Sequence, residues 1–137
     1  MTATPRLLGE RALGDRLERL LAVARPGAQV VGWATIDLDR LGPGVELPDD
    51  DLLGARVRRL DETRLALEPA TEGRLAAALA RHGEGPLVLY VIAETGDVGD
   101  LALTSPANGP LGRQRLVLGG PIGGPHLVVV APATIEP

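Results

Sequence analysis

The chain has 137 residues, of which 45% are hydrophobic, so it is one domain by size and can bury a substantial core. Its net charge is −4 and it contains no lysine, which argues against nucleic-acid binding and excludes Schiff-base chemistry on a lysine side chain. It has no cysteine, and we expect neither a signal peptide nor a membrane span, so we predict a bacterial cytoplasmic protein that makes no disulfide.

The first half of the chain predicts one helix followed by strands. Apolar residues recur at helical spacing over residues 10–24, and a Pro-Gly pair then ends the helix. Residues 29–36 are apolar on both faces, which predicts a central strand. Residues 39–50 are rich in glycine and proline and predict a loop. Apolar and polar residues then alternate, which predicts strands over residues 54–60 and 63–68.

The second half predicts the same kinds of element. A helix is expected over residues 71–83, with Thr71 as its N-cap and Gly83 just past its end. An apolar strand follows over residues 86–93. Residues 96–112 predict a loop with one short strand at Leu101–Leu103, and the last strands are predicted over residues 114–118 and 126–131.

One internal similarity links the two halves. A helix end, a glycine turn and an apolar strand occur twice, and Val30-Val31 corresponds to Val88-Leu89 at an offset of 58 residues. This pattern predicts a single domain over residues 1–137, built from pseudo-repeats of about residues 10–70 and 71–132.

Two segments resemble the glyoxalase-like proteins of the vicinal-oxygen-chelate superfamily. Residues 30–40 (VVGWATIDLDR) are similar to the opening strand of that family, usually His-x-Gly-x-x-Val-x-Asp-Leu. The stretch from Leu53-Gly54 through Gly83-Glu84-Gly85 is similar to the corresponding part of methylmalonyl-CoA epimerase-like members. The resemblance implies an α+β fold, with a strongly curved, mainly antiparallel sheet made from two pseudo-repeats and with two helices.

The resemblance also locates the positions at which family enzymes hold a metal ion. Those enzymes commonly place His, Glu or Gln, His and Glu on four strands, and the matching positions here are Val30, Leu65, Val88 and either Val128 or Val129. Aliphatic side chains cannot coordinate a divalent ion, which needs nitrogen, oxygen or sulfur ligands. We therefore predict a member that lacks the metal ligands and uses no cofactor.

Three residues are weak catalytic candidates for acid–base chemistry, namely Glu68, Glu84 and His126. Glu84 lies between two glycines, where an exposed turn residue is the ordinary alternative. His126 begins a strand after a Gly/Pro-rich loop, and an isolated histidine there is more often structural. No carboxylate is arranged around either histidine of the chain by local spacing.

Four residues are candidates for ligand binding. Trp33 and Tyr90 lie on the two similar strands, where they would line a cleft in a cupped sheet or simply fill the core of a protein without phenylalanine. Arg113 and Arg115 alternate with Gln114 and would present guanidinium groups to an anionic ligand, or form an ordinary solvent face.

Three hypotheses for the function follow. The first is a metal-free protein that binds a small organic ligand on the concave face of the sheet. The second is an acid–base epimerase or lyase that works without metal, and the third is a structural or interaction module with no ligand. An enzyme is the less favoured class, and we expect a homodimer with no nucleic-acid or membrane partner.

Overall fold

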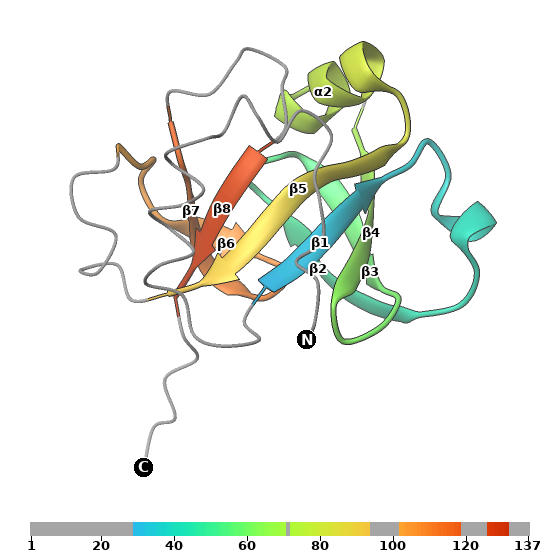
Figure 1. Cartoon of the computed structure of the whole chain (residues 1–137), viewed down its shortest axis with the longest axis horizontal. Coiled ribbons are helices and arrows are strands. Elements are labelled where there is room, and N and C mark those ends of the chain that lie inside the picture. Colours follow the sequence, from blue (N-terminus) through green and yellow to red (C-terminus); the bar gives the residue numbers. More distant parts are fainter. Residues whose placement is uncertain (1–28, 71, 94–101, 119–125, 132–137) are drawn as a thin grey trace, which may run out of the picture.

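The computed structural model describes residues 29–70, 72–93, 102–118 and 126–131, and within them it forms one sheet flanked by one α-helix (Figure 1). The helical segments are the 3₁₀-helix η1 (Leu38–Leu41) and the α-helix α2 (Arg74–His82). The strands are β1 (Gln29–Ala34), β2 (Val45–Asp50), β3 (Ala55–Arg59), β4 (Arg64–Pro69), β5 (Gly85–Ile92), β6 (Ala107–Gly109), β7 (Gly112–Leu116) and β8 (His126–Val130).

The sheet is mixed, which corrects the prediction of a mainly antiparallel one. Its strand order is β2-β3-β4-β1-β5-β8-β7-β6, and the β1–β4 and β5–β8 pairs are parallel. In each half, the two strands that pair in parallel are separated along the chain by a long connection. The apolar pattern of a strand reports its burial but not the direction of its neighbour, so the sequence did not reveal these pairs.

Strong curvature brings the two edges of the sheet together. The amide of Asp51, just past edge strand β2, donates to the carbonyl oxygen of Asn108 on edge strand β6 at 3.1 Å. Side chains from strands as far apart in the sheet as β3 and β7 therefore share one buried cluster on the concave side. We call it the interior core; it comprises Val30, Ala34, Leu53, Ala55, Val57, Leu65, Leu67, Leu75, Ala78, Leu87, Val88, Tyr90, Leu116, Val128 and Val130.

The predicted loop over residues 39–50 is in part wrong. It holds most of η1 and the edge strand β2, which pairs with β3 from Val45 opposite Arg59 to Asp50 opposite Ala55. Most of β2 is solvent-exposed and its register shifts between Leu47 and Asp50, around Pro48, so the segment lacks the alternation that marks a half-buried strand. Strand β6 was likewise missed inside the predicted loop over residues 96–112, where the short strand was expected at Leu101–Leu103 instead. Leu103 makes an isolated bridge to Val117, and residue 101 lies outside the described residues.

The helices were predicted only in part. The helix expected over residues 10–24 lies outside the described residues, and those residues contain one α-helix where two were predicted for the chain. Helix α2 lies within the predicted residues 71–83. Its N-cap is Gly73, while Thr71 lies outside the described residues. Gly83 ends the helix as predicted, with φ of 80° and its amide donating to Leu79.

The remaining predicted strands are confirmed as β1, β3, β4, β5, β7 and β8 within a few residues of their expected ends. None of the helices in the described ranges is long and apolar enough to cross a membrane.

Candidate functional site

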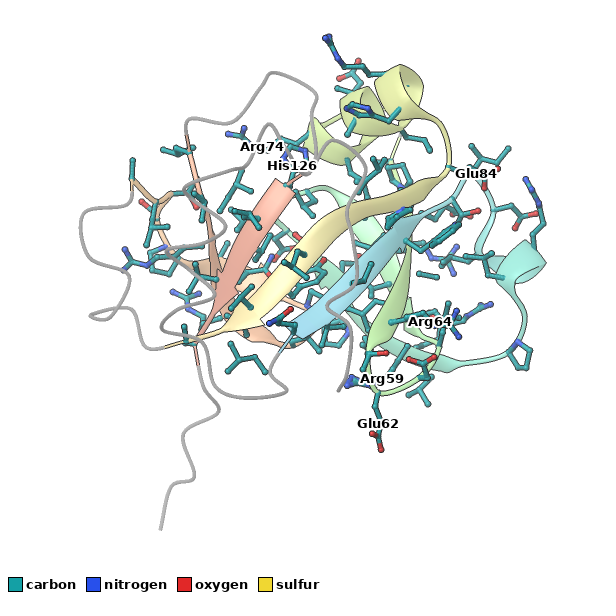
Figure 2. All side chains as sticks on the ribbon, in the orientation of Figure 1. Arg59, Glu62, Arg64, Arg74, Glu84 and His126 are labelled. Carbon is teal, nitrogen blue, oxygen red and sulfur yellow. The ribbon has the colours of Figure 1, made fainter. Side chains whose placement is uncertain are left out.

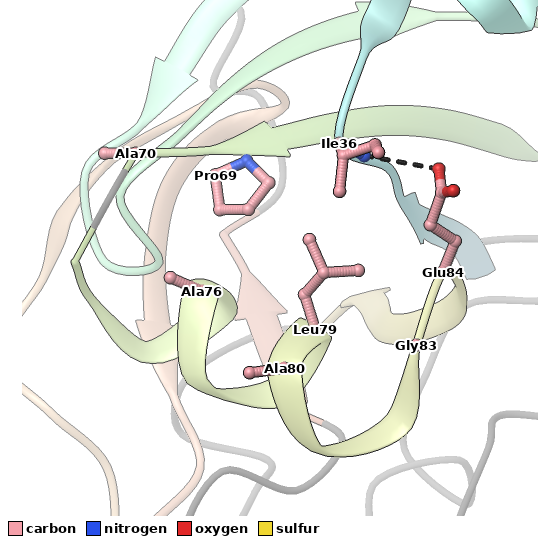
Figure 3. A pocket seen from close by; sticks show the side chains of 8 residues that line it. All are labelled: Ile36, Pro69, Ala70, Ala76, Leu79, Ala80, Gly83 and Glu84. Carbon is pink, nitrogen blue, oxygen red and sulfur yellow. Dashed lines mark hydrogen bonds between the residues drawn. The ribbon is translucent and has the colours of Figure 1, made fainter.

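Among the described residues, a cleft that could hold a small molecule lies beside helix α2, at the ends of β1 and β4 (Figure 3). Its volume is about 570 Å³. Seven of its eight lining residues carry no polar side chain, and the eighth, Glu84, stands at one end. The lining residues of this α2 cleft are Ile36, Pro69, Ala70, Ala76, Leu79, Ala80, Gly83 and Glu84.

The spacing of residues on α2 explains why one side of the helix packs against the interior core while a neighbouring side leaves the cleft open. Leu75 and Ala78 point into the interior core, where they are fully buried. Ala76 and Ala80, four residues apart, lie on a neighbouring stripe of the helix with Leu79 and face the cleft. Because two of these three side chains are methyl groups, the space between α2 and the sheet ends stays open.

Ile36 forms part of the opposite wall, and it is held there by a network around the turn that follows β1. Its side chain is 64% exposed, unusual for an isoleucine. Glu84 fixes the backbone of this turn: its Oε2 accepts a hydrogen bond from the Thr35 hydroxyl at 2.6 Å and one from the Ile36 amide at 3.2 Å. Arg40 of η1 lies 3.2 Å from Oε1 of the same carboxylate.

Glu84 is therefore a carboxylate surrounded by donors. The hydrogen bond from Thr35, followed by that from the Ile36 amide and the charge of Arg40, lowers the pKa of Glu84 below its ordinary value. The residue is ionised at neutral pH and is a poorer base than a free glutamate. Its arrangement suits the binding of a donor or a cation better than proton abstraction.

The other two catalytic candidates do not join Glu84. Glu68 on β4 accepts from the Leu38 amide at 3.1 Å and from Arg56 at 3.4 Å. His126 lies with its Nε2 at 3.4 Å from the carbonyl oxygen of Arg74, and Figure 2 shows it well separated from Glu84. Burial lowers the pKa of His126, so the imidazole is neutral at physiological pH. A catalytic role for any of the three stays a prediction.

The structure does not bring Trp33 and Tyr90 together. Tyr90 pairs with Val30 and is fully buried in the interior core, where its hydroxyl donates to Oδ2 of Asp50 at 2.7 Å. Trp33 is three positions from Val30 along β1, so it faces the other side of the sheet, and it is 38% exposed. The two rings therefore cannot form one wall of a cleft, and a ligand contact of Trp33 alone stays a prediction.

Arg113 and Arg115 do lie together. They line a hollow of about 180 Å³ on β7 with Pro106, Val129 and Ala131, and Nη1 of Arg113 donates to Asn108 at 3.3 Å. Since β8, β5 and β1 separate β7 from β4, this hollow is a different place from the α2 cleft. Ligand binding by the two arginines stays a prediction.

Sequence reasoning missed Asp50 and most of the α2 cleft. Asp50 is buried, and its Oδ1 accepts from the amides of Leu52 and Leu53 while its Oδ2 accepts from Tyr90. Three consecutive aspartates are typical of a solvated turn, so nothing in the pattern marked the middle one as buried. The cleft residues come from three separate chain segments, and only Glu84, through its Gly-Glu-Gly setting, carried a local signal.

Metal ligands do not gather in the part of the chain that the structure describes. Within the described ranges, no group of three or more His, Asp or Glu side chains is placed to hold a metal ion. The four positions that the family resemblance assigns to metal ligands lie on β1, β4, β5 and β8, and the side chains at Val30, Leu65, Val88 and Val128 all pack in the interior core.

Comparisons with protein-family models and with curated proteins found no match. Solved structures do share the fold. A methylmalonyl-CoA epimerase in complex with methylmalonyl-CoA and NH₄⁺ matches with a TM-score of 0.62 and 19% identity, over 83% of this chain and 98% of that one.

Two further epimerase structures match similarly. A variant of the Streptomyces coelicolor methylmalonyl-CoA epimerase, in complex with 2-nitronate-propionyl-CoA, gives a TM-score of 0.59 and 20% identity over 78% of this chain and 94% of that one. The Mycobacterium tuberculosis methylmalonyl-CoA epimerase matches with a TM-score of 0.61 and 20% identity, over 76% of this chain and 86% of that one. The chain therefore shares the fold of these epimerases, which is the glyoxalase-like fold that the sequence resemblance predicts.

Proposed function

We propose that this protein binds a small organic ligand in the α2 cleft and that it does so without a divalent metal ion. The observation that carries the proposal is an apolar cleft of about 570 Å³ with a single charged group, Glu84, at one end. Small-molecule sites are commonly of this size, roughly 300–1,000 Å³, with apolar walls and a few polar groups that orient the ligand. Structures with this fold hold coenzyme A derivatives, which supports a ligand-binding role.

The packing of the interior core supports the α2 cleft over the concave face as the ligand site. Val57, Leu65 and Val88 are fully buried there, and Tyr90 fills the centre with its ring. Closure of the sheet edges at Asp51 and Asn108 leaves these side chains packed on one another. A ligand placed among them would have to displace close-packed hydrocarbon, at a cost that an open cleft avoids.

The residues at the four family positions do not fit a divalent ion. Val30, Leu65, Val88 and Val128 offer only hydrocarbon, and a metal ion needs deprotonated nitrogen, oxygen or sulfur. Tyr90 and Asp50 are polar and close by, but the phenol donates a hydrogen bond to one carboxylate oxygen of Asp50, and the other oxygen accepts from two backbone amides. We therefore assign no reaction step to a metal ion.

Two alternatives have particular observations behind them. An epimerase or lyase without metal is favoured by the fold of the matched enzymes, although Glu68 and Glu84 both hold backbone amides and Glu84 is stabilised as the ion. An interaction module without ligand is favoured by the filled interior core. A stereospecific proton exchange catalysed by the protein would support the first alternative. A screen in which no metabolite binds would support the second.

The test is a screen of small metabolites by ¹⁵N NMR and thermal shift, with two matched helix variants. Ala76→Leu fills the α2 cleft, whereas Ala77→Leu makes the same change on an exposed position of α2 outside it. We expect metabolites that bind to shift the amide signals of α2 and of the turn at Glu84. Their affinity should fall by at least about tenfold in Ala76→Leu and should not change in Ala77→Leu. Hits that bind both variants equally would place the ligand elsewhere.

A further inference from the structure

We infer that the α2 cleft selects ligands with a short branched alkyl body and a protonated amine, and that it rejects carboxylates and phosphates of the same size. This inference rests on the proposed function, because it names the class of ligand for the same cleft. It follows from which atoms of Glu84 are already occupied and from what the remaining walls offer.

Every group that contacts Glu84 in the described residues is a hydrogen-bond donor. The Thr35 hydroxyl and the Ile36 amide use Oε2, and the Arg40 guanidinium lies against Oε1. An ionised carboxylate has about four lone-pair positions, of which these contacts use three. The remaining position belongs to Oε1, and a ligand atom that reaches it must be a donor.

The charge of the head group follows from the same contacts. The Thr35 and Ile36 hydrogen bonds hold Glu84 as an anion, and an ammonium group forms a charge-assisted hydrogen bond with a carboxylate. A ligand carboxylate or phosphate would instead face a like charge beside an apolar wall that screens poorly. Arg40 offers an anion a partner, but its side chain is 56% exposed and it does not line the cleft.

The rest of the cleft specifies the body of the ligand. Its other described walls are the alkyl side chains of Ile36, Pro69 and Leu79 and the methyl groups of alanines, with no aromatic ring among them. Among the described residues Glu84 is the one lining residue with a polar side chain, so a charged head group is best placed at the Glu84 end. A compact, branched alkyl group fills such a space and removes these walls from water.

The experiment uses three probes that share one branched five-carbon skeleton, namely isopentylamine, isopentanol and isovalerate, added to the ¹⁵N-labelled protein near neutral pH. The amide signals of Ala76, Leu79 and Glu84 report on the cleft. We expect saturable shifts with the amine, binding of the alcohol weaker by about tenfold, and no cleft shifts with isovalerate at the same concentrations.

Variants then separate the head-group claim from the cleft itself. Glu84→Gln should lower the affinity for isopentylamine by about tenfold, to the affinity for isopentanol. Glu72→Gln removes the same charge from an exposed residue outside the cleft, and it should leave the affinity for isopentylamine unchanged. Ala76→Leu should lower the affinities for the amine and the alcohol alike, and Ala77→Leu is its control.

Each outcome decides between the two claims. Isovalerate binding in the cleft as tightly as the amine would overturn the inference while leaving the ligand site standing, and so would a folded Glu84→Gln protein that binds the amine normally. The wild-type probe series decides the same point if Glu84→Gln does not fold. If neither the amine nor the alcohol shifts the cleft amides, the inference is overturned, and the metabolite screen described above decides the proposed function independently. If ligands bind but Ala76→Leu changes their affinity no more than Ala77→Leu does, the proposed function itself fails.

Discussion

Tyr90 allows the packed interior to be tested through a single titrating group. It is the only tyrosine, and the chain contains no lysine and no cysteine. Its hydroxyl is fully buried and donates to Asp50 at 2.7 Å. Burial, and then the charge of Asp50, raises the pKa of Tyr90 well above 10.0. From about pH 9 to about pH 12, no other side chain of this protein has an ordinary pKa in the range.

The direction of the pH effect follows from proton binding. In the unfolded chain the phenol ionises near pH 10, whereas in the folded protein it keeps its proton to higher pH. Above about pH 10 the folded state therefore binds more protons than the unfolded state, so the stabilisation is fully present below that pH and is lost as pH rises toward the folded pKa. The free energy of unfolding should therefore fall as pH rises above about 10, with a slope of at most about 1.4 kcal/mol per pH unit.

The assay is urea unfolding followed by circular dichroism across this pH range, for the wild type and for Tyr90→Phe. We expect the wild type to lose stability with rising pH and the variant to show a nearly level profile. At neutral pH the variant should be less stable by about 1–3 kcal/mol, because Asp50 loses a buried donor. The reasoning would be refuted by tyrosinate absorbance that appears near pH 10 while the protein is still folded.

Three further predictions concern packing, metal binding and assembly. Gly32→Ala should lower the free energy of unfolding by about 1–3 kcal/mol in urea, because the added Cβ would lie 2.6 Å from Leu67 and 3.0 Å from Val88. Protein purified without a histidine tag should hold less than about one tenth of an equivalent of Zn, Ni, Fe or Mn by elemental analysis, and a stoichiometric metal would contradict the metal-free proposal. Light scattering should give the mass of a homodimer at concentrations on the order of tens of micromolar, and a monomer there would count against self-association.

The strands with alternating or wholly apolar residues were predictable because burial alone determines that pattern. β3, with Val57 buried between exposed or half-buried arginines, and β5, apolar throughout, are examples. β2 was not predictable, since edge strands need little burial and its partner β3 supplies the hydrogen bonds. The α2 cleft was hidden for another reason: Ile36, Pro69 and Leu79 are ordinary apolar residues until curvature and α2 bring them together. Only the unusual setting of Glu84 was visible in advance.

A repeat relation between the two halves would explain why a glycine and a tyrosine lie near the centre of the sheet. We propose that residues 10–70 and 71–132 are pseudo-repeats, as their similarity at an offset of 58 predicts. Under that offset Val31 corresponds to Leu89, and these two residues are paired across the antiparallel β1–β5 junction. Each half also repeats one strand arrangement, in which its first strand pairs in parallel with its last.

A symmetry axis through the Val31–Leu89 pair would make Gly32 the counterpart of Tyr90. Both positions lie on the face of the interior core, but a Cβ on Gly32 would stand only 3.2 Å from the ring of Tyr90. Two large side chains cannot occupy the space over this axis, so a ring in one half requires its absence in the other. The ring that fills this space also gives Asp50 its donor. On this argument, the asymmetry that closes the concave face is the reason that ligand binding would fall to the α2 cleft.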